Sequence, residues 1–569
     1  MLALSIASRR FEELLHPLAY GQVSTITFLW AERLGVVLFG VNEPALRALP
    51  FIAGSILCLG IAAVARRFLR SDETLVAVVL TVFSHVLIRY SAEVKPYSLD
   101  ALLTLAVVGG AAAVLREMDN RRSWVVLGFA GAVAVASSLP SPFVCAGVVL
   151  ALSIQAFREG RVRFLSRIGL LGLFWAALFS LLYTRFYRTS GNAPYMREFW
   201  EGAFLTPGSP HLLARTRRAL AEVSSVIDPG LTLLGLGSLA LALALLGAAI
   251  LHRRGQSAYA VLLFVPGVAP VAASGLGVYP VATRLLLFAA PCWVMLMGVG
   301  TIGAARALHG LVPRVPVRWA AAVLLLPAVT TGFASLLYQR DQQMRPLVQE
   351  LRSRWQAGEA VYVFHRVVPA WLVYSTDWAD PNFGRLEWAM RVSGPGGLGH
   401  ENGPTRGSRL PGEGEDLVYQ LKGHPVLLGV SSGVQGRRMS AHVAAPDPGW
   451  ARNEGRRIRD AASPGIWIVL GNASSNGSDL GTVLLDAVKH NEGRITFEDS
   501  LQDGKLYRVE FDGSLRSSKH HEEGGQVDGE EEHGPHLGHE GWQRGGVLLA
   551  HRGERNCNPR SHNEDSHLH

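Results

Sequence analysis

The chain has 569 residues, of which 49% are hydrophobic and 18% are charged, and its formal net charge is +8. This composition is too apolar for a wholly water-soluble protein. The arginines concentrate in short segments between apolar runs, so the positive charge does not indicate a nucleic-acid partner. Four scattered cysteines without ligand spacing indicate neither a disulfide framework nor a zinc site, and no metal site is assigned.

Residues 1–45 are amphipathic and do not read as a membrane span. Apolar residues recur at helical spacing over 11–18, and the apolar stretch 23–40 carries Glu32 and Arg33 in its middle. We expect helices that lie at the outer membrane interface. The pattern leaves open whether they are plain surface helices or help to form a site.

Residues 46–338 contain ten apolar runs, most of about 16 to 22 residues, the length that crosses about 30 Å of hydrocarbon as a helix. The expected spans are 46–66, 75–90, 97–115, 123–139, 143–157, 167–187, 231–251, 258–278, 285–304 and 319–338. Comparable runs are absent from the sequence after residue 338. The pattern therefore predicts a multi-span helical membrane domain followed by a soluble one.

Basic residues mark every second junction between the expected spans. These junctions are 66–70, 116–122, 158–167, 252–254 and 306–318. They should be cytoplasmic, and the intervening junctions 91–97, 137–143, 188–230 and 278–284 should face outward. This parity places Met1 outside, so we expect a segment that precedes it.

The outward junction between the second and third spans carries an acid and a base, Glu93 and Lys95, flanked by Tyr90 and Tyr97. Charge at the end of an apolar helix needs a partner. Such residues are either interfacial anchors that reach the headgroups or groups that bind a charged ligand at the membrane surface. We expect Glu93 to pair with Lys95 or with Arg284.

Six stretches in the same order resemble the GT-C glycosyltransferases, in particular the bacterial branch similar to protein O-mannosyltransferases and lipid A aminoarabinose transferases. They are His16–Gln22, Leu38–Arg47, Glu93–Tyr97, Tyr195–Trp200, Tyr279–Arg284, and Met344–Val348 followed by Ala360–Phe364. The resemblance covers roughly residues 1–512, and it depends on the order and the common membrane side of these stretches.

The resemblance implies transfer of a sugar from a polyprenyl-phosphate donor to an acceptor on the outer face of the bacterial cytoplasmic membrane. Lys95 and Arg284, at two outer helix ends, should converge on the donor phosphate, with Glu93 in an orienting role. The other substrate-binding candidates are Tyr97, Tyr90, Tyr279, Arg47, His16, Tyr20 and Gln22. The acceptor (protein, lipid or glycan) and any divalent metal stay open, and no cofactor besides the lipid-linked donor is implied.

The chain departs from the family pattern at its catalytic carboxylate. The resemblance implies an Asp that acts as the catalytic base, shortly before the His16–Gln22 stretch and just after a first span. The sequence begins at Met1 and contains neither that span nor that Asp. Glu12 and Glu13 do not match that motif, and the role is not transferred to them. We expect either that Met1 is internal to a longer protein or that this copy is truncated and inactive; the parity of the junctions favours the first.

Residues 339–513 read as an extracytoplasmic α/β domain. Strand-like runs at 361–365, 425–430, 465–470 and 505–511 alternate with helical stretches at 344–355 and 480–490. Residues 514–569 are rich in Gly, Glu and His and poor in apolar residues, which predicts a disordered tail.

Two other functions are compatible with the sequence. A transporter or flippase for lipid-linked saccharides should show paired repeats or mid-membrane polar residues, whereas the polar residues here collect at the outer helix ends. A non-catalytic saccharide-binding membrane protein is the natural interpretation if the catalytic carboxylate is missing.

Overall fold

The computed structural model describes most of the first 511 residues. The described ranges are 2–18, 22–188, 199–338, 344–376, 418–421, 424–429, 448–462, 465–471, 474–475, 478–501 and 504–511. The candidate Tyr20, the segment 195–198 and the tail 514–569 lie outside these ranges.

The amino-terminal part is a small helical cluster with its own apolar core. Its elements are α1 (Leu2–Ser8), the 3₁₀ turn η1 (Glu13–Leu15) and α2 (Ile26–Phe39). Leu2, Ile6, Leu14 and Phe28 belong to this core. The helix expected over 11–18 is wrong, because only η1 forms there: the backbone at His16 is extended, and the proline that follows disfavours the helical conformation.

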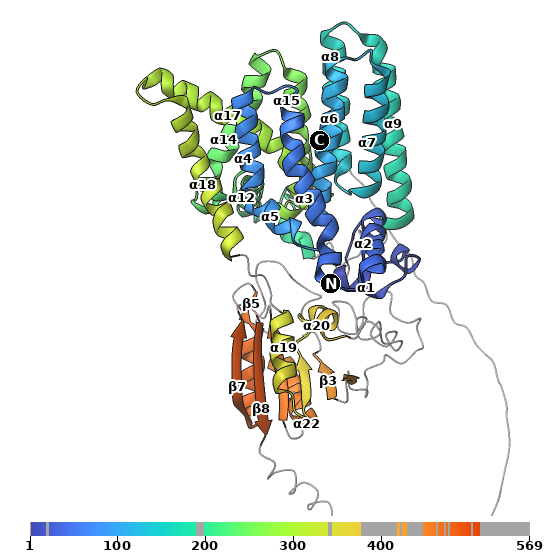
Figure 1. Cartoon of the computed structure of the whole chain (residues 1–569), viewed down its shortest axis with the longest axis vertical. Helices are drawn as coiled ribbons and strands as arrows, with labels where there is room; N and C mark the ends of the chain where they lie inside the picture. Colours follow the sequence, from blue (N-terminus) through green and yellow to red (C-terminus); the bar gives the residue numbers. More distant parts are fainter. Residues whose placement is uncertain are drawn as a thin grey trace, which may run out of the picture. The chain divides into compact units, whose positions relative to one another are not determined.

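Helices overlap all ten ranges in which the sequence predicts membrane spans. They are α3 (Glu43–Ala65), α4 (Ser71–Val82) with α5 (His85–Ser91), α6 (Tyr97–Arg116), α7 (Arg121–Ser137), α8 (Ser141–Arg158), α9 (Leu165–Leu182) with the π-helical η4 (Tyr183–Tyr187), α14 (Gly237–Arg253), α15 (Ser257–Gly275), α17 (Ala290–Leu311) and α18 (Val317–Tyr338). Figure 1 shows α6, α7, α8 and α9 side by side.

Seven helical runs within the described ranges are long and apolar enough to cross a bilayer. The pair α4 and α5 is an eighth if it counts as one span, although it bends by 51° where the sequence predicts a continuous helix. Ser84 begins the second helix of this pair by accepting a hydrogen bond from the Leu87 N–H at 3.4 Å. The chain is thus a multi-span helical membrane protein, and the count of ten spans stays a prediction.

Shorter elements connect these helices. They are η3 (Val162–Phe164), η5 (Glu201–Ala203), α12 (Leu212–Ile227), α13 (Pro229–Leu233), α16 (Thr283–Leu286) and η6 (Leu287–Ala289).

Glycines let the central helices approach closely. A Cβ added at Gly300 would lie 1.8 Å from the main-chain oxygen of Leu243, and one added at Gly247 would lie 1.9 Å from that of Leu296. These positions join α14 to α17 backbone to backbone. Residues 298–303 have the GxGxxG spacing of a nucleotide-binding loop, but they lie inside α17 and no strand precedes them. We therefore interpret these glycines as helix-packing residues.

Charged contacts gather the arginine-rich junctions at one end of the bundle. The Glu73 carboxylate accepts hydrogen bonds from Arg254 at 2.5 and 3.1 Å. Arg161 pairs with Asp119 at 3.0 Å, and Arg158 donates to the Gly255 main-chain oxygen at 2.9 Å. Junctions that alternate along the sequence thus share one end, as the charge pattern predicts.

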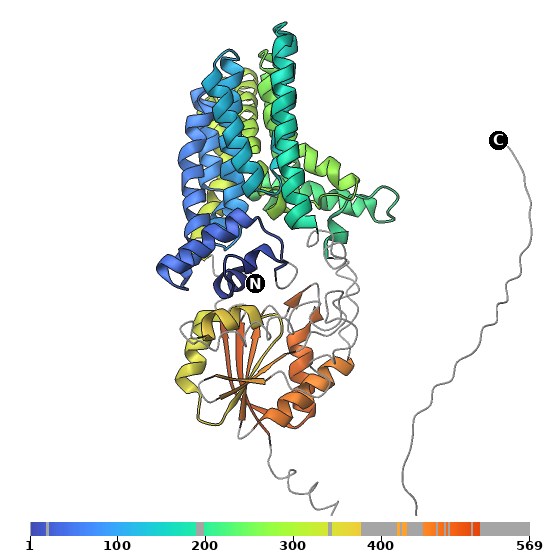
Figure 2. The same ribbon diagram turned by 90° about the vertical axis from the view of Figure 1, so that its right-hand side faces the viewer.

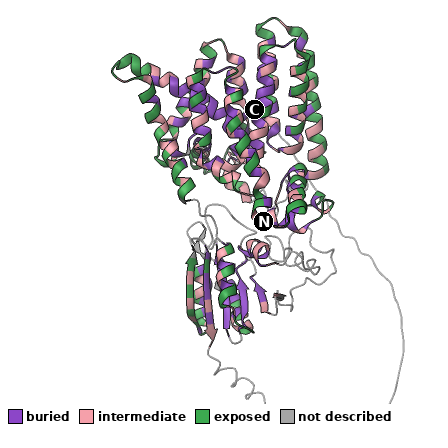
Figure 3. Cartoon of the chain, in the orientation of Figure 1, coloured by how far each residue is buried: buried purple, intermediate pink, exposed green. Residues whose placement is uncertain are grey.

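The outer surface of the bundle is apolar. On α9, the side chains of Leu170, Leu173 and Leu181 are all exposed, and only 11% of its most apolar stretch is buried inside the protein. Figure 3 shows this exposure along the peripheral helices. Such a surface suits contact with lipid tails.

The segment from residue 344 to residue 511 forms an α/β sheet structure. Its elements are α19 (Met344–Arg354), β1 (Ala360–Val363), α20 (Val368–Ser375), β2 (Val418–Leu421), β3 (His424–Leu428), α22 (Pro448–Ala461), β4 (Gly465–Gly471), β5 (Ser474–Ser475), β6 (Ser478–Asp479), α23 (Leu480–His490), β7 (Gly493–Leu501) and β8 (Gly504–Phe511). The main sheet has the order β2-β3-β1-β4-β8-β7, with β1 parallel to both of its neighbours and the outer pairs antiparallel.

The sheet is covered on both faces, and its central strands are wholly buried. Figure 2 shows the yellow helix α19 on one side of the sheet and the orange helices α22 and α23 on the other. Tyr362, Trp371 and Trp467 are among the largest fully buried side chains. Strands β1, β3, β4 and β8 coincide with the four strand-like runs of the sequence, which are apolar because both sheet faces are covered.

Candidate functional site

Lys95 lies between α5 and α6 and is half-buried. Its Nζ donates a hydrogen bond to Oε1 of Gln22 at 2.7 Å, which joins two predicted site residues. Burial, together with the neighbouring positive charge of Arg284, lowers the pKa of Lys95 to about 8, although Glu93 opposes this effect. Lys95 is therefore a cation at neutral pH, held close to a second cation.

Arg284 is the second residue of α16, in the junction before α17. Its guanidinium carbon lies 4.8 Å from the centre of the Trp200 ring, an arrangement typical of a cation–π contact. Within the part of the chain that the structure describes, no carboxylate forms an ion pair with Arg284, so its donors can serve a ligand.

Three tyrosines accompany the two cations. The rings of Tyr90 and Tyr97 meet edge to face with centroids 5.0 Å apart, and both side chains interact electrostatically with Arg284. Tyr279 donates from its hydroxyl to the Leu285 main-chain oxygen at 2.8 Å. The residues that the sequence predicts from separate outer junctions thus lie around one site.

Glu93 takes a different partner from the one that the sequence predicts. Its carboxylate accepts a hydrogen bond from Nε of Arg89 at 3.1 Å, a pair four residues apart in sequence. The expected direct pair with Lys95 or Arg284 is wrong. An arginine on the preceding turn is the nearer partner, which leaves the two site cations without a bound carboxylate.

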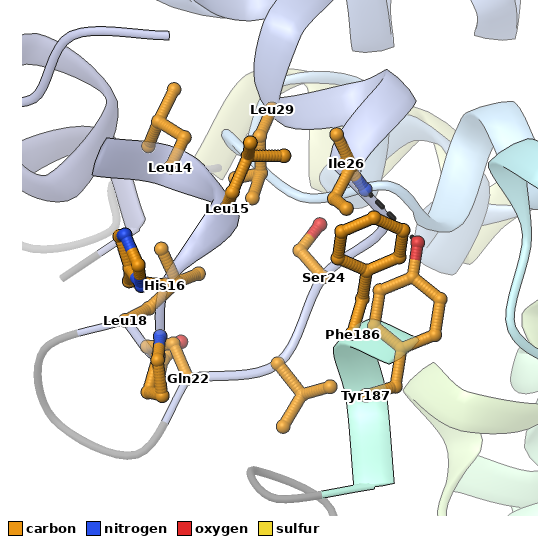
Figure 4. Close-up of a pocket in the computed structure, with 12 residues that line it drawn as sticks. Leu14, Leu15, His16, Leu18, Gln22, Ser24, Ile26, Leu29, Phe186 and Tyr187 are labelled. Atoms are coloured by element: carbon orange, nitrogen blue, oxygen red, sulfur yellow. Dashed lines mark hydrogen bonds between the residues drawn. The ribbon is translucent and has the colours of Figure 1, made fainter. Parts of the chain in front are cut away.

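A small cavity of about 20 Å³ lies beside this site. Its lining is mostly apolar, as Figure 4 shows, and comprises Leu14, Leu15, His16, Pro17, Leu18, Gln22, Val23, Ser24, Ile26, Leu29, Phe186 and Tyr187. Gln22 lines the cavity and also accepts the hydrogen bond of Lys95, so the cavity and the cationic pair are neighbours.

The two sides of the cavity come from distant parts of the chain. The predicted residues His16 and Gln22 precede α2, whereas Tyr187 ends η4. The Ile26 N–H donates to the Tyr187 hydroxyl at 3.2 Å and ties these sides together. Tyr187 could not be predicted as part of this cavity, because the residue that it contacts lies 161 residues away in the sequence.

Arg47 lies apart from the cationic pair in its contacts. It faces Glu43 on the same helix, with Nη1 and Oε2 4.0 Å apart, and it is partly exposed. A pair of this kind, four residues apart, is usual on a helix surface. Among the described residues, no contact joins Arg47 to the other candidates.

Glu32 is a buried carboxyl on α2. It is 1% exposed, and neither carboxylate oxygen has a hydrogen-bond partner among the residues that the structure describes. Burial raises the pKa of Glu32 to about 8. The group therefore carries a proton at neutral pH.

The arrangement is suited to binding an anionic group at the outer helix ends. Lys95 and Arg284 supply charged donors, and the tyrosines supply hydroxyls and aromatic surface. Within the described ranges, His, Cys, Asp and Glu side chains do not gather in groups of three that could hold a metal ion.

Comparison with known proteins gives one family match and distant structural likenesses. Residues 23–183 match the family model described as dolichyl-phosphate-mannose-protein mannosyltransferase. Comparison with curated protein sequences gives no match.

Two solved structures illustrate the structural likeness. One is ArnT from Cupriavidus metallidurans bound to undecaprenyl phosphate, with 11% identity and a TM-score of 0.44 over 89% of this chain and 93% of that one. The other is the oligosaccharyltransferase AglB from Archaeoglobus fulgidus in complex with an inhibitory peptide and a dolichol-phosphate, with 12% identity and a TM-score of 0.45 over 89% of this chain and 70% of that one.

The matched segment contains Lys95, begins directly after Gln22 and ends before Arg284. Over residues 23–183 the chain is thus similar to the dolichyl-phosphate-mannose-protein mannosyltransferases, which confirms the resemblance to GT-C glycosyltransferases of the protein O-mannosyltransferase type.

Proposed function

We propose that this chain is an integral-membrane glycosyltransferase that moves a sugar from a polyprenyl-phosphate donor to an acceptor at the outer face of the cytoplasmic membrane. The observation that carries the proposal is that two half-buried cations from junctions far apart in the sequence interact electrostatically: Lys95, which is bound to Gln22, and Arg284, which lies over the Trp200 ring. Two like charges held together without a bound carboxylate favour an anionic ligand between them.

The chemistry requires such a cationic pair. In the transfer, an acceptor oxygen bonds to the anomeric carbon while the bond from that carbon to the phosphate oxygen breaks. The leaving polyprenyl phosphate gains negative charge, which Lys95 and Arg284 stabilise, and the acceptor proton passes to a base. The base is not assigned, and Glu93, held by Arg89, has an orienting role beside Lys95.

The family match supports the class of donor. The matching family is named for mannosyl transfer from dolichyl phosphate, a polyprenyl-type lipid, and the match includes Lys95. The solved ArnT structure holds undecaprenyl phosphate, a lipid of the same chemical class. We further propose that residues 339–513 lie on the extracytoplasmic side of the membrane and take part in binding the acceptor.

Binding of undecaprenyl phosphate to the purified protein in lipid nanodiscs tests the proposal directly. We expect Lys95→Ala and Arg284→Ala each to weaken binding about tenfold or more, because each removes a charge-assisted hydrogen bond. Arg121→Ala is the matched control, since Arg121 begins α7 at the arginine-rich end of the bundle, and its binding should equal that of the wild type.

Transfer is then followed with a radiolabelled polyprenyl-phosphate sugar. Loss of both binding and transfer in the two variants, with unchanged thermal unfolding, supports the enzyme. Binding that depends on Lys95 and Arg284 without any transfer supports a non-catalytic lipid-saccharide binding protein. Equal binding by wild type and both variants would show that Lys95 and Arg284 do not bind the donor phosphate.

A further inference from the structure

Glu222 on α12 holds the turn that carries Arg284. Its carboxylate Oε2 accepts a hydrogen bond from the Thr283 N–H at 2.7 Å and another from the Thr283 hydroxyl at 2.5 Å. The other oxygen, Oε1, lies 3.5 Å from Nε of Arg218. The side chain is 23% exposed, so these contacts are partly shielded from water.

The hydrogen bond from the Thr283 N–H to Glu222 satisfies a backbone donor at the start of α16, where no neighbouring side chain caps the helix. Thr283 is the first residue of α16, and the preceding Ala282 offers no side-chain acceptor. The first N–H groups of a helix need acceptors from elsewhere, and here Glu222 supplies one from 61 residues earlier in the chain. Because Arg284 follows Thr283 directly, this contact fixes the backbone from which its side chain leaves.

Further contacts fasten the same turn from other sides. The Val281 N–H donates to the Ala203 main-chain oxygen at 2.9 Å, which links the turn to η5. Trp200 covers the guanidinium of Arg284. The outer segment from residue 199 to residue 227 thus holds Arg284 at its backbone and at the head of its side chain.

We propose that Glu222 is a positioning residue that acts through Arg284 to aim its guanidinium at the donor phosphate. This inference rests on the proposed function, because it assigns Glu222 a part in binding the polyprenyl phosphate. In this role Glu222 acts through Thr283, from which its Oε2 accepts two hydrogen bonds. Glu222 could not be predicted from the sequence, since a glutamate between arginines on an amphipathic helix is usual surface composition.

The charge of Glu222 makes the test sharp. A carboxylate near an anion site repels the ligand, so simple electrostatics predicts tighter binding when the charge is removed. Positioning predicts the opposite for Glu222→Ala, because the acceptor for Thr283 is lost. Glu222→Gln separates the two effects, since an amide oxygen still accepts from Thr283 while the charge is gone.

The experiment measures undecaprenyl phosphate binding in nanodiscs for wild type, Glu222→Ala, Glu222→Gln, Arg284→Ala and the double variant Glu222→Ala/Arg284→Ala. We expect Glu222→Ala to weaken binding about tenfold and Glu222→Gln to bind as well as wild type or better. In the Arg284→Ala background, Glu222→Ala should cause no further loss, because both changes remove one interaction. Glu159→Ala is the control and should bind like wild type, since Glu159 pairs with Arg161 at 3.1 Å at the arginine-rich end of the bundle.

The outcomes separate this inference from the proposed function. If Arg284→Ala weakens binding while Glu222→Ala binds like wild type or more tightly, the positioning role is overturned and the proposed function stands. Equal losses in Glu222→Ala and Glu222→Gln, or additive losses in the double variant, also overturn it. If Arg284→Ala itself binds normally, the proposed function fails first.

Discussion

Lys95 donates a hydrogen bond to Gln22 across 73 residues of sequence, with Nζ and Oε1 2.7 Å apart. The amide of Gln22 is neutral, so it does not neutralise the positive charge of the Lys95 ammonium. A carboxylate in its place would neutralise that charge. Gln22 thus orients Lys95 while preserving its attraction for an anion.

The alkaline limit of donor binding should follow the titration of Lys95. Its pKa is lowered to about 8, so the residue is charged below this pH and loses its proton as the pH rises through it. We expect the affinity for undecaprenyl phosphate to fall between about pH 7 and about pH 9 in wild type. Lys95→Arg keeps its charge throughout, so its affinity should stay level over this interval. An identical alkaline fall in both proteins would assign the titration to another group.

Glu32 should make the folded protein less stable as the pH rises. Its pKa in the fold is about 8 against 4.5 for the free side chain, so the folded state holds the extra proton between these values. The free energy of unfolding therefore declines as the pH rises through this window. Glu32→Gln should make that decline shallower in thermal unfolding, whereas the exposed Glu12→Gln should leave it unchanged. A parallel decline in Glu32→Gln and wild type would contradict the assignment.

The packing of α17 against α14 should be sensitive to one added methyl group at Gly300. The added Cβ would overlap the Leu243 main-chain oxygen at 1.8 Å, and neither backbone can move easily. We expect Gly300→Ala to lower the free energy of unfolding by about 1–3 kcal/mol or more, measured by thermal unfolding in detergent. Gly310→Ala on the same helix is the control, because no atom lies within 4 Å of its Cβ position. It should be neutral or slightly stabilising, since alanine favours helix; equal loss in both variants would refute the packing role.

Glu73 should be costly to remove because it is wholly buried between arginines. Its side chain is 0% exposed, and Arg254 donates to both carboxylate oxygens. Glu73→Ala leaves that guanidinium unpaired, and we expect a loss of about 3–5 kcal/mol in the free energy of unfolding. Glu159→Ala removes an exposed pair with Arg161 and should lose about 0–1 kcal/mol. Losses of similar size in the two variants would show that burial of the pair is unimportant.

The general architecture could be predicted from the sequence because it depends on patterns that repeat locally. Apolar runs of spanning length and arginines at alternate junctions indicate the helices and their two ends. The same pattern predicts that Lys95 and Arg284 lie at helix ends on one side of the membrane. Strands β1, β3, β4 and β8 could be predicted from runs rich in apolar residues, whereas β2 and β7 were not predicted.

The details of the site depend on contacts that no local pattern records. Tyr187 meets Ile26 and Glu222 meets Thr283 only after the chain has folded, across 161 and 61 residues. The preference of Glu93 for Arg89 over the site cations is decided by the geometry at the end of α5. The bend between α4 and α5 depends on one serine that caps a helix within an apolar run.

The bond between Glu73 and Arg254 also sets an order of events during synthesis. The acid emerges from the ribosome 181 residues before its partner. The pair cannot form before that later segment has been synthesised, so the final surroundings of Glu73 are completed only after α14.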